Sequence, residues 1–85
     1  MWFIYILRCS DGTFYTGITM NVDRRIKEHN TNNTIGARYT RIRRPVTLAY
    51  LEKSKSRSSA GKREREIKRL SRVTKIKLIE NSLKR

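Results

Sequence analysis

The feature that most restricts the fold of this chain is a turn signal near its beginning. Residues 2–7 and 13–19 are rich in aromatic and β-branched residues, and the short segment from Cys9 to Gly12 separates them. Two such runs joined by Asp-Gly are typical of a β-hairpin. The pattern therefore predicts that the first two strands are antiparallel neighbours.

The length of this turn decides which side chains share a face of the sheet. A two-residue turn would place Tyr5 and Tyr15 on opposite faces. A three-residue turn with Gly12 at positive φ would pair Tyr5 with Gly17. Both tyrosines would then lie on one face. Because a slip of one residue turns every side chain over, the register matters, and the strand sequences alone allow both registers.

Helical spacing predicts two helices after the hairpin. Asn21 is a favourable N-cap. Apolar residues and His29 follow it at helical spacing, which predicts a helix over residues 22–30. After a polar loop, a second and shorter helix is predicted within residues 35–43.

The second half of the chain predicts one strand and two more helices. Residues 46–51 are β-branched and apolar and predict a strand, whereas residues 53–59 are basic and serine-rich and predict a loop. Ser58 or Ser59 can cap a helix that runs to about Leu70. Ser71 can cap a last helix over residues 72–83, with a predicted apolar stripe of Val73, Ile76 and Ile79 or Leu83.

The resulting order, β-β-α-α-β-α-α, predicts an α+β fold in one domain spanning residues 1–85. A small three-stranded sheet, made of the N-terminal antiparallel hairpin and a third strand, would be flanked by helices. Spacing does not give the direction of the third strand.

Charge restricts the partners of this chain. Its 21 Lys and Arg residues face 7 Asp and Glu residues, a net charge of +14. Such self-repulsion is relieved by a polyanion, so nucleic acid is the first candidate and an anionic membrane the second. The apolar run over residues 1–7 is too short to span a bilayer and lacks the form of a signal peptide. We expect no membrane partner. A single cysteine, Cys9, fits a reduced cytoplasmic protein.

The first predicted helix places an arginine beside the core. Arg25 and His29 flank its apolar side, whereas Arg24 faces water. An arginine at the edge of a core face favours an anionic ligand. The alternatives are an ion pair within the chain and a side chain whose stem packs on the core while its charged end reaches water.

The third predicted helix repeats this pattern with an acid. Glu64 lies on the core-facing side and Glu66 does not. In a chain with only 7 acidic residues, Glu64 is a candidate metal ligand. The alternative is a surface pair with Lys68 one turn later.

Short segments at fixed spacing carry a family resemblance. The segments Tyr5-Ile6-Leu7 and Tyr15-Thr16-Gly17 begin ten residues apart, Arg25 follows after another ten, and Glu64 lies in a late helix. Residues 36–40, 43–45 and 66–72 continue the pattern. Together they resemble the GIY-YIG nuclease superfamily, and most closely its small stand-alone bacterial branch, over about residues 2–80. Phe3 replaces the first glycine of the family name, and Thr16 replaces the middle residue of the second half-motif.

The resemblance implies an endonuclease that hydrolyses phosphodiester bonds with one divalent metal. It implies a catalytic set of Tyr5, Tyr15, Arg25, His29 and Glu64. Arg25 would stabilise negative charge at phosphorus, and Glu64 would hold Mg²⁺ or Mn²⁺, weakly in the absence of substrate.

The two tyrosines would handle the attacking water. Tyr5 would activate it, provided that nearby cations lower the pKa of its hydroxyl. Tyr15 would orient water or phosphate. His29 would contact phosphate, relay a proton or serve as a structural histidine. Packing roles are expected for Tyr39 and Tyr50.

Binding is expected to rely on phosphates. The predicted contacts are Arg38, Arg41, Arg43, Arg44, Lys68 and Arg69. Phosphate contacts position a nucleic acid without specifying its sequence, so we expect low sequence specificity, with DNA favoured over RNA and a monomer favoured. The alternatives are a non-catalytic basic module that binds nucleic acid, RNA included, and a basic ribosome-associated protein. Neither alternative requires the complete catalytic set.

Overall fold

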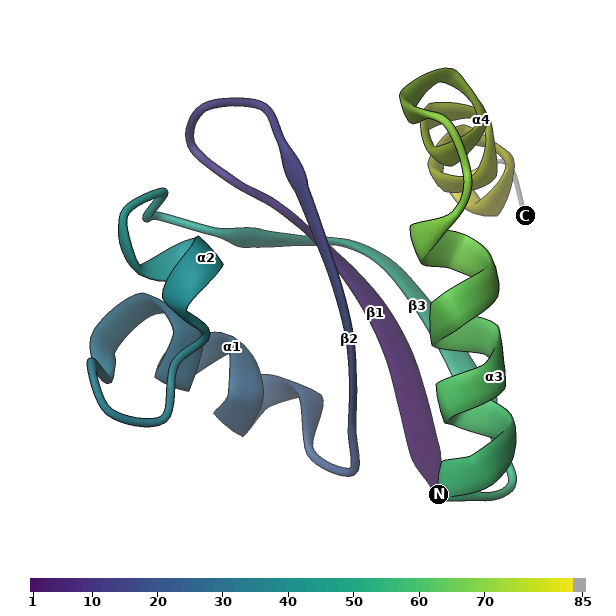
Figure 1. The fold of residues 1–85 in the computed structure, drawn as a ribbon, viewed down its shortest axis with the longest axis horizontal. Coiled ribbons are helices and arrows are strands. Elements are labelled where there is room, and N and C mark those ends of the chain that lie inside the picture. The colour runs from purple at the N-terminus through teal and green to yellow at the C-terminus, as the bar shows by residue number, and fades with distance from the viewer. Residues whose placement is uncertain (84–85) are drawn as a thin grey trace.

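The structure, a computed structural model, describes residues 1–83, which form a three-stranded antiparallel sheet between two pairs of helices (Figure 1). The strands are β1 (Trp2–Arg8), β2 (Phe14–Thr19) and β3 (Thr47–Ser54), in the order β2-β1-β3. The helices are α1 (Val22–Thr31), α2 (Arg38–Arg41), α3 (Arg57–Lys68) and α4 (Arg72–Leu83). The predicted α+β class and element order are confirmed.

The hairpin has the three-residue turn. Gly12 adopts a φ of 83°, in the region that favours glycine. The backbone amide of Cys9 donates to the carbonyl of Thr13 at 2.8 Å, and that of Gly12 donates to Cys9 at 2.9 Å. This turn pairs Tyr5 with Gly17. It thereby selects one of the two registers that the sequence left open.

Strand β3 pairs antiparallel with the free side of β1 and extends farther than predicted. Ser54 lies opposite Trp2 and Lys53 opposite Phe3, so part of the predicted loop is strand. Pairing with β1 overrides the polar composition of this segment. Helix α3 is capped by Ser56, whose side chain accepts a hydrogen bond from the amide of Ser59. The predicted cap at Ser58 or Ser59 is therefore wrong by two or three residues.

Helix α1 begins as predicted, because the Asn21 side chain accepts a hydrogen bond from the amide of Arg24 at 3.1 Å. Helix α2 is shorter than predicted. The Asn32 side chain accepts hydrogen bonds from the amides of Thr34 and Ile35, which holds that segment in a turn. The predicted helix over residues 35–43 is thus reduced to Arg38–Arg41.

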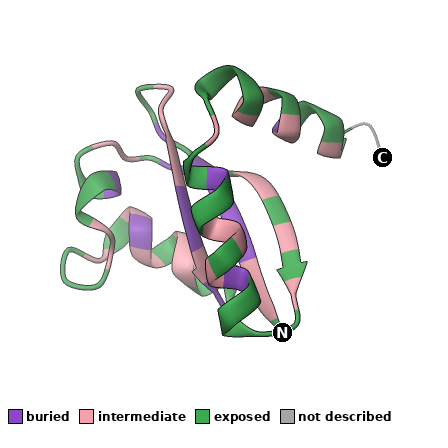
Figure 2. Cartoon of the chain, turned by 45° about the vertical axis from the view of Figure 1, so that its right-hand side comes forward, coloured by how far each residue is buried: buried purple, intermediate pink, exposed green. Residues whose placement is uncertain are grey.

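Alternate residues of β1 divide the interior into two clusters. Figure 2 shows buried residues along the strands and on the helices that pack against them. Ile4 and Ile6 pack with residues of α3 and α4. Tyr5 and Leu7 pack on the other face, toward α1. The central strand therefore carries both the apolar core and one of the proposed site residues.

The apolar stripe predicted for α4 is only partly correct. Ile79 is buried, but Val73 is 62% exposed and Leu83 is 76% exposed. Leu78 packs against the core instead. Helix α4 meets the sheet mainly along β3, so a narrower side of the helix is covered than its sequence suggests. No helix within residues 1–83 is long and apolar enough to cross a membrane.

Candidate active site

Tyr5 and Tyr15 lie on the same face of the hairpin, with ring centroids 6.5 Å apart. This is the arrangement expected of a three-residue turn. The Tyr5 ring crosses directly over Gly17, where an added Cβ would lie 2.6 Å from Tyr5 Cζ. A glycine is therefore required opposite Tyr5, and the second half-motif has a steric role in placing the first.

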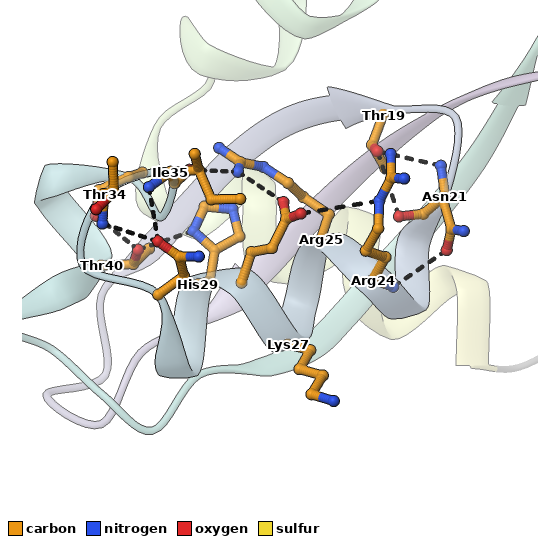
Figure 3. A network of polar contacts seen from close by, with 12 residues as sticks. Thr19, Asn21, Arg24, Arg25, Lys27, His29, Thr34, Ile35 and Thr40 are labelled. Carbon is orange, nitrogen blue, oxygen red and sulfur yellow. Dashed lines mark hydrogen bonds and ion pairs between the residues drawn. The ribbon is translucent and has the colours of Figure 1, made fainter.

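Arg25 projects from α1 toward this face, as the helical wheel predicted. Its side chain is 26% exposed, compared with 70% for Arg24. The Arg25 guanidinium donates to a Glu28 carboxylate oxygen at 3.1 Å and to the carbonyl of Ile35 at 2.5 Å, contacts that Figure 3 shows together. In the free protein the anionic partner of Arg25 is thus a carboxylate of its own helix.

His29 is fully buried, and both of its ring nitrogens have partners. Nε2 lies 2.9 Å from the Tyr5 hydroxyl oxygen, and Nδ1 lies 2.8 Å from Thr40 Oγ1. Burial, and then the charge of Arg25, lower the pKa of His29 to about 4. His29 is therefore neutral at physiological pH. With no exposed surface, it is not placed to contact a phosphate directly.

The electrostatics of Tyr5 differ from the expectation. Burial raises the pKa of the Tyr5 hydroxyl to about 12 and outweighs the lowering effect of Arg25. The condition stated for Tyr5, that nearby cations lower this pKa, is not met in the free protein. One guanidinium does not compensate for the loss of water around a phenolate.

Glu64 approaches from α3, close enough for its charge to raise the pKa of Tyr5, although burial is the larger cause. Its carboxylate is half-buried and lies 3.4 Å from Nζ of Lys68, whereas Glu66 is exposed. The core-facing position and the surface pair are therefore both present.

The donor set for a metal is small. Within residues 1–83, no group of three or more His, Cys, Asp or Glu side chains is placed to hold a metal ion. The half-buried Glu64 carboxylate fits a hard cation that keeps most of its waters, such as Mg²⁺. Its partner Lys68 is half-exposed and free to turn away.

Four of the six predicted phosphate contacts, Arg41, Arg43, Arg44 and Lys68, have partners within the protein. Arg44 donates to the carbonyl oxygens of His29 at 2.6 Å and Asn32 at 3.2 Å, which satisfies the end of α1. Arg43 pairs with Asp11 at 3.1 Å. Because both guanidinium groups bind parts of the fold, we leave Arg43 and Arg44 out of the proposed interface. Arg41 donates to a backbone carbonyl, and both Arg38 and Arg69 are exposed.

Two neighbouring residues of α2 were missed as site residues. The ring of Tyr39, for which only packing was expected, stacks on Tyr15 with centroids 6.0 Å apart. Thr40 is fully buried and bonds His29. A pocket of about 210 Å³ beside Tyr15 is lined by Phe14, Tyr15, Thr16, Tyr39, Lys68 and Lys75. It brings α2, β2, α3 and α4 together at the edge of the sheet.

Comparison with known proteins agrees with this arrangement. The sequence model of the GIY-YIG catalytic domain matches residues 1–77. The chain is 57% identical to a UPF0213 protein of Desulfotalea psychrophila, over 98% of this chain and 74% of that protein. It is 52% identical to a UPF0213 protein of Staphylococcus saprophyticus, over 91% of this chain and 92% of that one.

Two solved structures are similar to this chain in both sequence and fold. A UPF0213 protein from Bacillus halodurans, solved by solution NMR, is 44% identical with a TM-score of 0.59, covering 94% of this chain and 84% of that chain. A second NMR structure, of a protein from E. faecalis, is 40% identical with a TM-score of 0.61, covering 95% and 85%. The site agrees with these matches, because the tyrosines of both half-motifs lie on one face beside an inward-facing arginine. This chain belongs to the GIY-YIG nuclease family, among its small UPF0213 proteins.

Proposed function

We propose that this protein is an endonuclease of low sequence specificity that hydrolyses phosphodiester bonds, DNA in preference to RNA, with one divalent metal. One observation carries the proposal. Tyr5 of β1, Tyr15 of β2 and Arg25 of α1 meet at one site, and the Glu64 carboxylate of α3 is within electrostatic reach of it. A protein that only binds phosphates has no need of this set.

Arg25 is the candidate for stabilising the transition state. Attack by water builds negative charge on the phosphorus oxygens, and a guanidinium can donate two parallel hydrogen bonds to them. Its present partner, Glu28, is partly exposed. Exchange of that carboxylate for a phosphate costs little, because ion pairs near water are weak.

Glu64 would hold the metal, with water and phosphate oxygens completing its ligands. When bound, the metal would supply Lewis-acid stabilisation of the leaving oxygen. A single protein carboxylate explains why we expect weak affinity for Mg²⁺ or Mn²⁺ in the absence of nucleic acid.

Tyr5 would receive the proton of the attacking water. Burial raises the pKa of Tyr5 to about 12, so the Tyr5 hydroxyl is not ionised before the attack. As the water oxygen bonds to phosphorus and the bond to the leaving oxygen breaks, the water proton passes to Tyr5. The Tyr5 proton passes to Nε2 of His29, and the leaving oxygen takes a proton from solvent. Tyr15 would orient the water or the phosphate.

The net charge of +14 supports a grip on the phosphate backbone. Arg38, Arg41 and Arg69, with Lys68 once it leaves Glu64, are the proposed contacts. The absence of a separate base-reading element in the described fold supports low sequence specificity. We propose that the protein acts as a monomer in the cytoplasm.

The test is a cleavage panel of labelled single-stranded, duplex and branched DNA and RNA, with Mg²⁺, Mn²⁺ or EDTA. Wild type is compared with Glu64→Gln at equal purity. We expect metal-dependent cleavage by wild type and none by Glu64→Gln. Tight binding of nucleic acid without cleavage above the variant would establish the rival function, a non-catalytic binding module.

A further inference from the structure

The segment that contains α2 supplies proposed phosphate contacts on its surface, and it also places a polar side chain in the interior. Thr40 is fully buried, and its hydroxyl lies between Nδ1 of His29 at 2.8 Å and the carbonyl oxygen of Ala37 at 2.9 Å. Gly36 allows this close approach, since a Cβ there would lie 2.7 Å from the carbonyl oxygen of Glu28. The segment is therefore fitted tightly against α1.

The directions of these hydrogen bonds follow from the number of available protons. A carbonyl oxygen only accepts, so the single hydroxyl proton of Thr40 is donated to Ala37. Towards His29, the Thr40 oxygen must then accept, which requires a proton on Nδ1. Because His29 is neutral, Nε2 carries no proton. The hydrogen bond between Tyr5 and Nε2 is consequently donated by Tyr5.

We propose that Thr40 is a positioning residue, which holds His29 in the Nδ1-protonated form so that Tyr5 presents its oxygen to the substrate as an acceptor. The proposal rests on the proposed function for its link to cleavage. With the Tyr5 proton directed to His29, the free lone pair of the hydroxyl oxygen can accept a hydrogen bond from the attacking water.

The opposite tautomer would reverse this arrangement. A proton on Nε2 would be donated to the Tyr5 oxygen, and the Tyr5 proton would then be free to point into the site. Tyr5 would donate to a phosphate oxygen instead of accepting from water. The chain of Tyr5, His29, Thr40 and Ala37 spans β1, α1 and α2, so these three elements together set the polarity of one hydroxyl.

The test compares two substitutions of the same residue. Thr40→Ser keeps the hydroxyl, whereas Thr40→Val keeps the shape and removes the acceptor. The first readout is the ¹⁵N NMR spectrum of His29 in protein free of metal and nucleic acid, which distinguishes the two tautomers. We expect Nδ1–H in wild type and Thr40→Ser, and a shift toward Nε2–H in Thr40→Val.

The second readout is single-turnover cleavage. We expect a loss of at least ~10-fold in Thr40→Val, less than the ~10²–10⁴-fold that a positioned acid–base group contributes, because Tyr5 and His29 are both retained. Activity should return to within about threefold of wild type in Thr40→Ser, with unchanged affinity for nucleic acid in EDTA. A merely structural role would not be expected to couple tautomer and rate in this way.

Three results would overturn the proposal. They are an Nε2–H form in wild type, a changed tautomer in Thr40→Ser, and wild-type cleavage by a folded Thr40→Val with an altered tautomer. If Thr40→Val does not fold, wild type and Thr40→Ser still decide the tautomer. If wild type itself does not cleave, the proposed function fails. The ¹⁵N spectrum still shows whether Thr40 sets the tautomer of His29, so the two failures are distinguishable.

Discussion

The Tyr5 ring lies directly against the backbone of Gly17, its partner across the hairpin. No side chain fits between them. The Tyr5 hydroxyl, which we propose activates water, can take this position only because residue 17 has no side chain. A substitution that adds a methyl group at residue 17 should therefore disturb the site.

Gly17→Ala should displace the Tyr5 ring and break its hydrogen bond to His29. We expect a loss of about 1–3 kcal/mol in the free energy of unfolding, the usual cost of an overpacked interior, together with loss of cleavage. Gly61→Ala is the matched control, because its added Cβ meets nothing closer than 3.8 Å. It should stabilise α3 by about 0.5–1 kcal/mol. Urea unfolding measures both changes, and equal effects would contradict the steric argument.

Glu64→Gln and Arg25→Ala should abolish cleavage, whereas Glu66→Gln and Arg24→Ala should change it little. Glu66 is the matched control for Glu64, and Arg24 is the matched control for Arg25. Each control carries the same charge on the same helix but does not face the sheet. Loss of a preorganised donor such as Arg25 is expected to lower the rate by ~10²–10³. Single-turnover cleavage is the measurement, with circular dichroism as the check on folding. Wild-type activity in Glu64→Gln would end its assignment as the metal ligand.

The free energy of unfolding should fall between pH 6.5 and pH 4 through His29. Its pKa is lowered from 6.5 to about 4 by burial and by Arg25 and Arg44, against an opposing effect of Glu28. In this range the unfolded chain binds a proton that the folded protein excludes, so stability is present above the unfolded pKa and is lost as pH falls. The expected change is about 3 kcal/mol. Urea unfolding of wild type and of His29→Gln across this pH range measures the contribution of His29. If the free energy of unfolding falls equally in both proteins, His29 is not the cause.

Binding of nucleic acid should weaken steeply with salt. The slope of log K against log salt is expected to be about −0.7 to −0.9 for each phosphate contact. Arg38→Ala should reduce this slope by about one contact without loss of stability, because Arg38 is exposed. Arg44→Ala should lower the stability of the fold instead, because Arg44 holds the end of α1. Fluorescence anisotropy from low to physiological salt is the measurement, and a slope near zero would rule out a phosphate-based grip.

Local periodicity was sufficient to predict much of this molecule. The inward position of Arg25 on α1, the outward position of Glu66 on α3 and the cap at Asn21 follow from spacing within single helices. The face shared by Tyr5 and Tyr15 follows from the length of one turn.

Properties that arise between elements could not be predicted. The pKa of Tyr5 depends on how completely other elements cover it, and burial reverses the direction that its neighbouring arginine suggests. Thr40 sits in a polar stretch where no periodic pattern marks one threonine as buried. The end of β3 is set by its pairing with Trp2, far away in the sequence. In each case the missing information is a tertiary contact.

The division of β1 into two alternating sets of side chains restricts how this protein can change. Substitutions at Ile4 and Ile6 alter the packing of α3 and α4, while those at Tyr5 alter the opposite face. The two sets therefore reach the site by different routes: Tyr5 acts directly, whereas Ile4 and Ile6 act through α3, which carries Glu64. Insertion or deletion of one residue within β1 would exchange them, placing the tyrosine in the apolar interior and an isoleucine at the site. A change in the length of the turn between Arg8 and Phe14 is restricted in the same way, because the three-residue turn sets the register of the two strands.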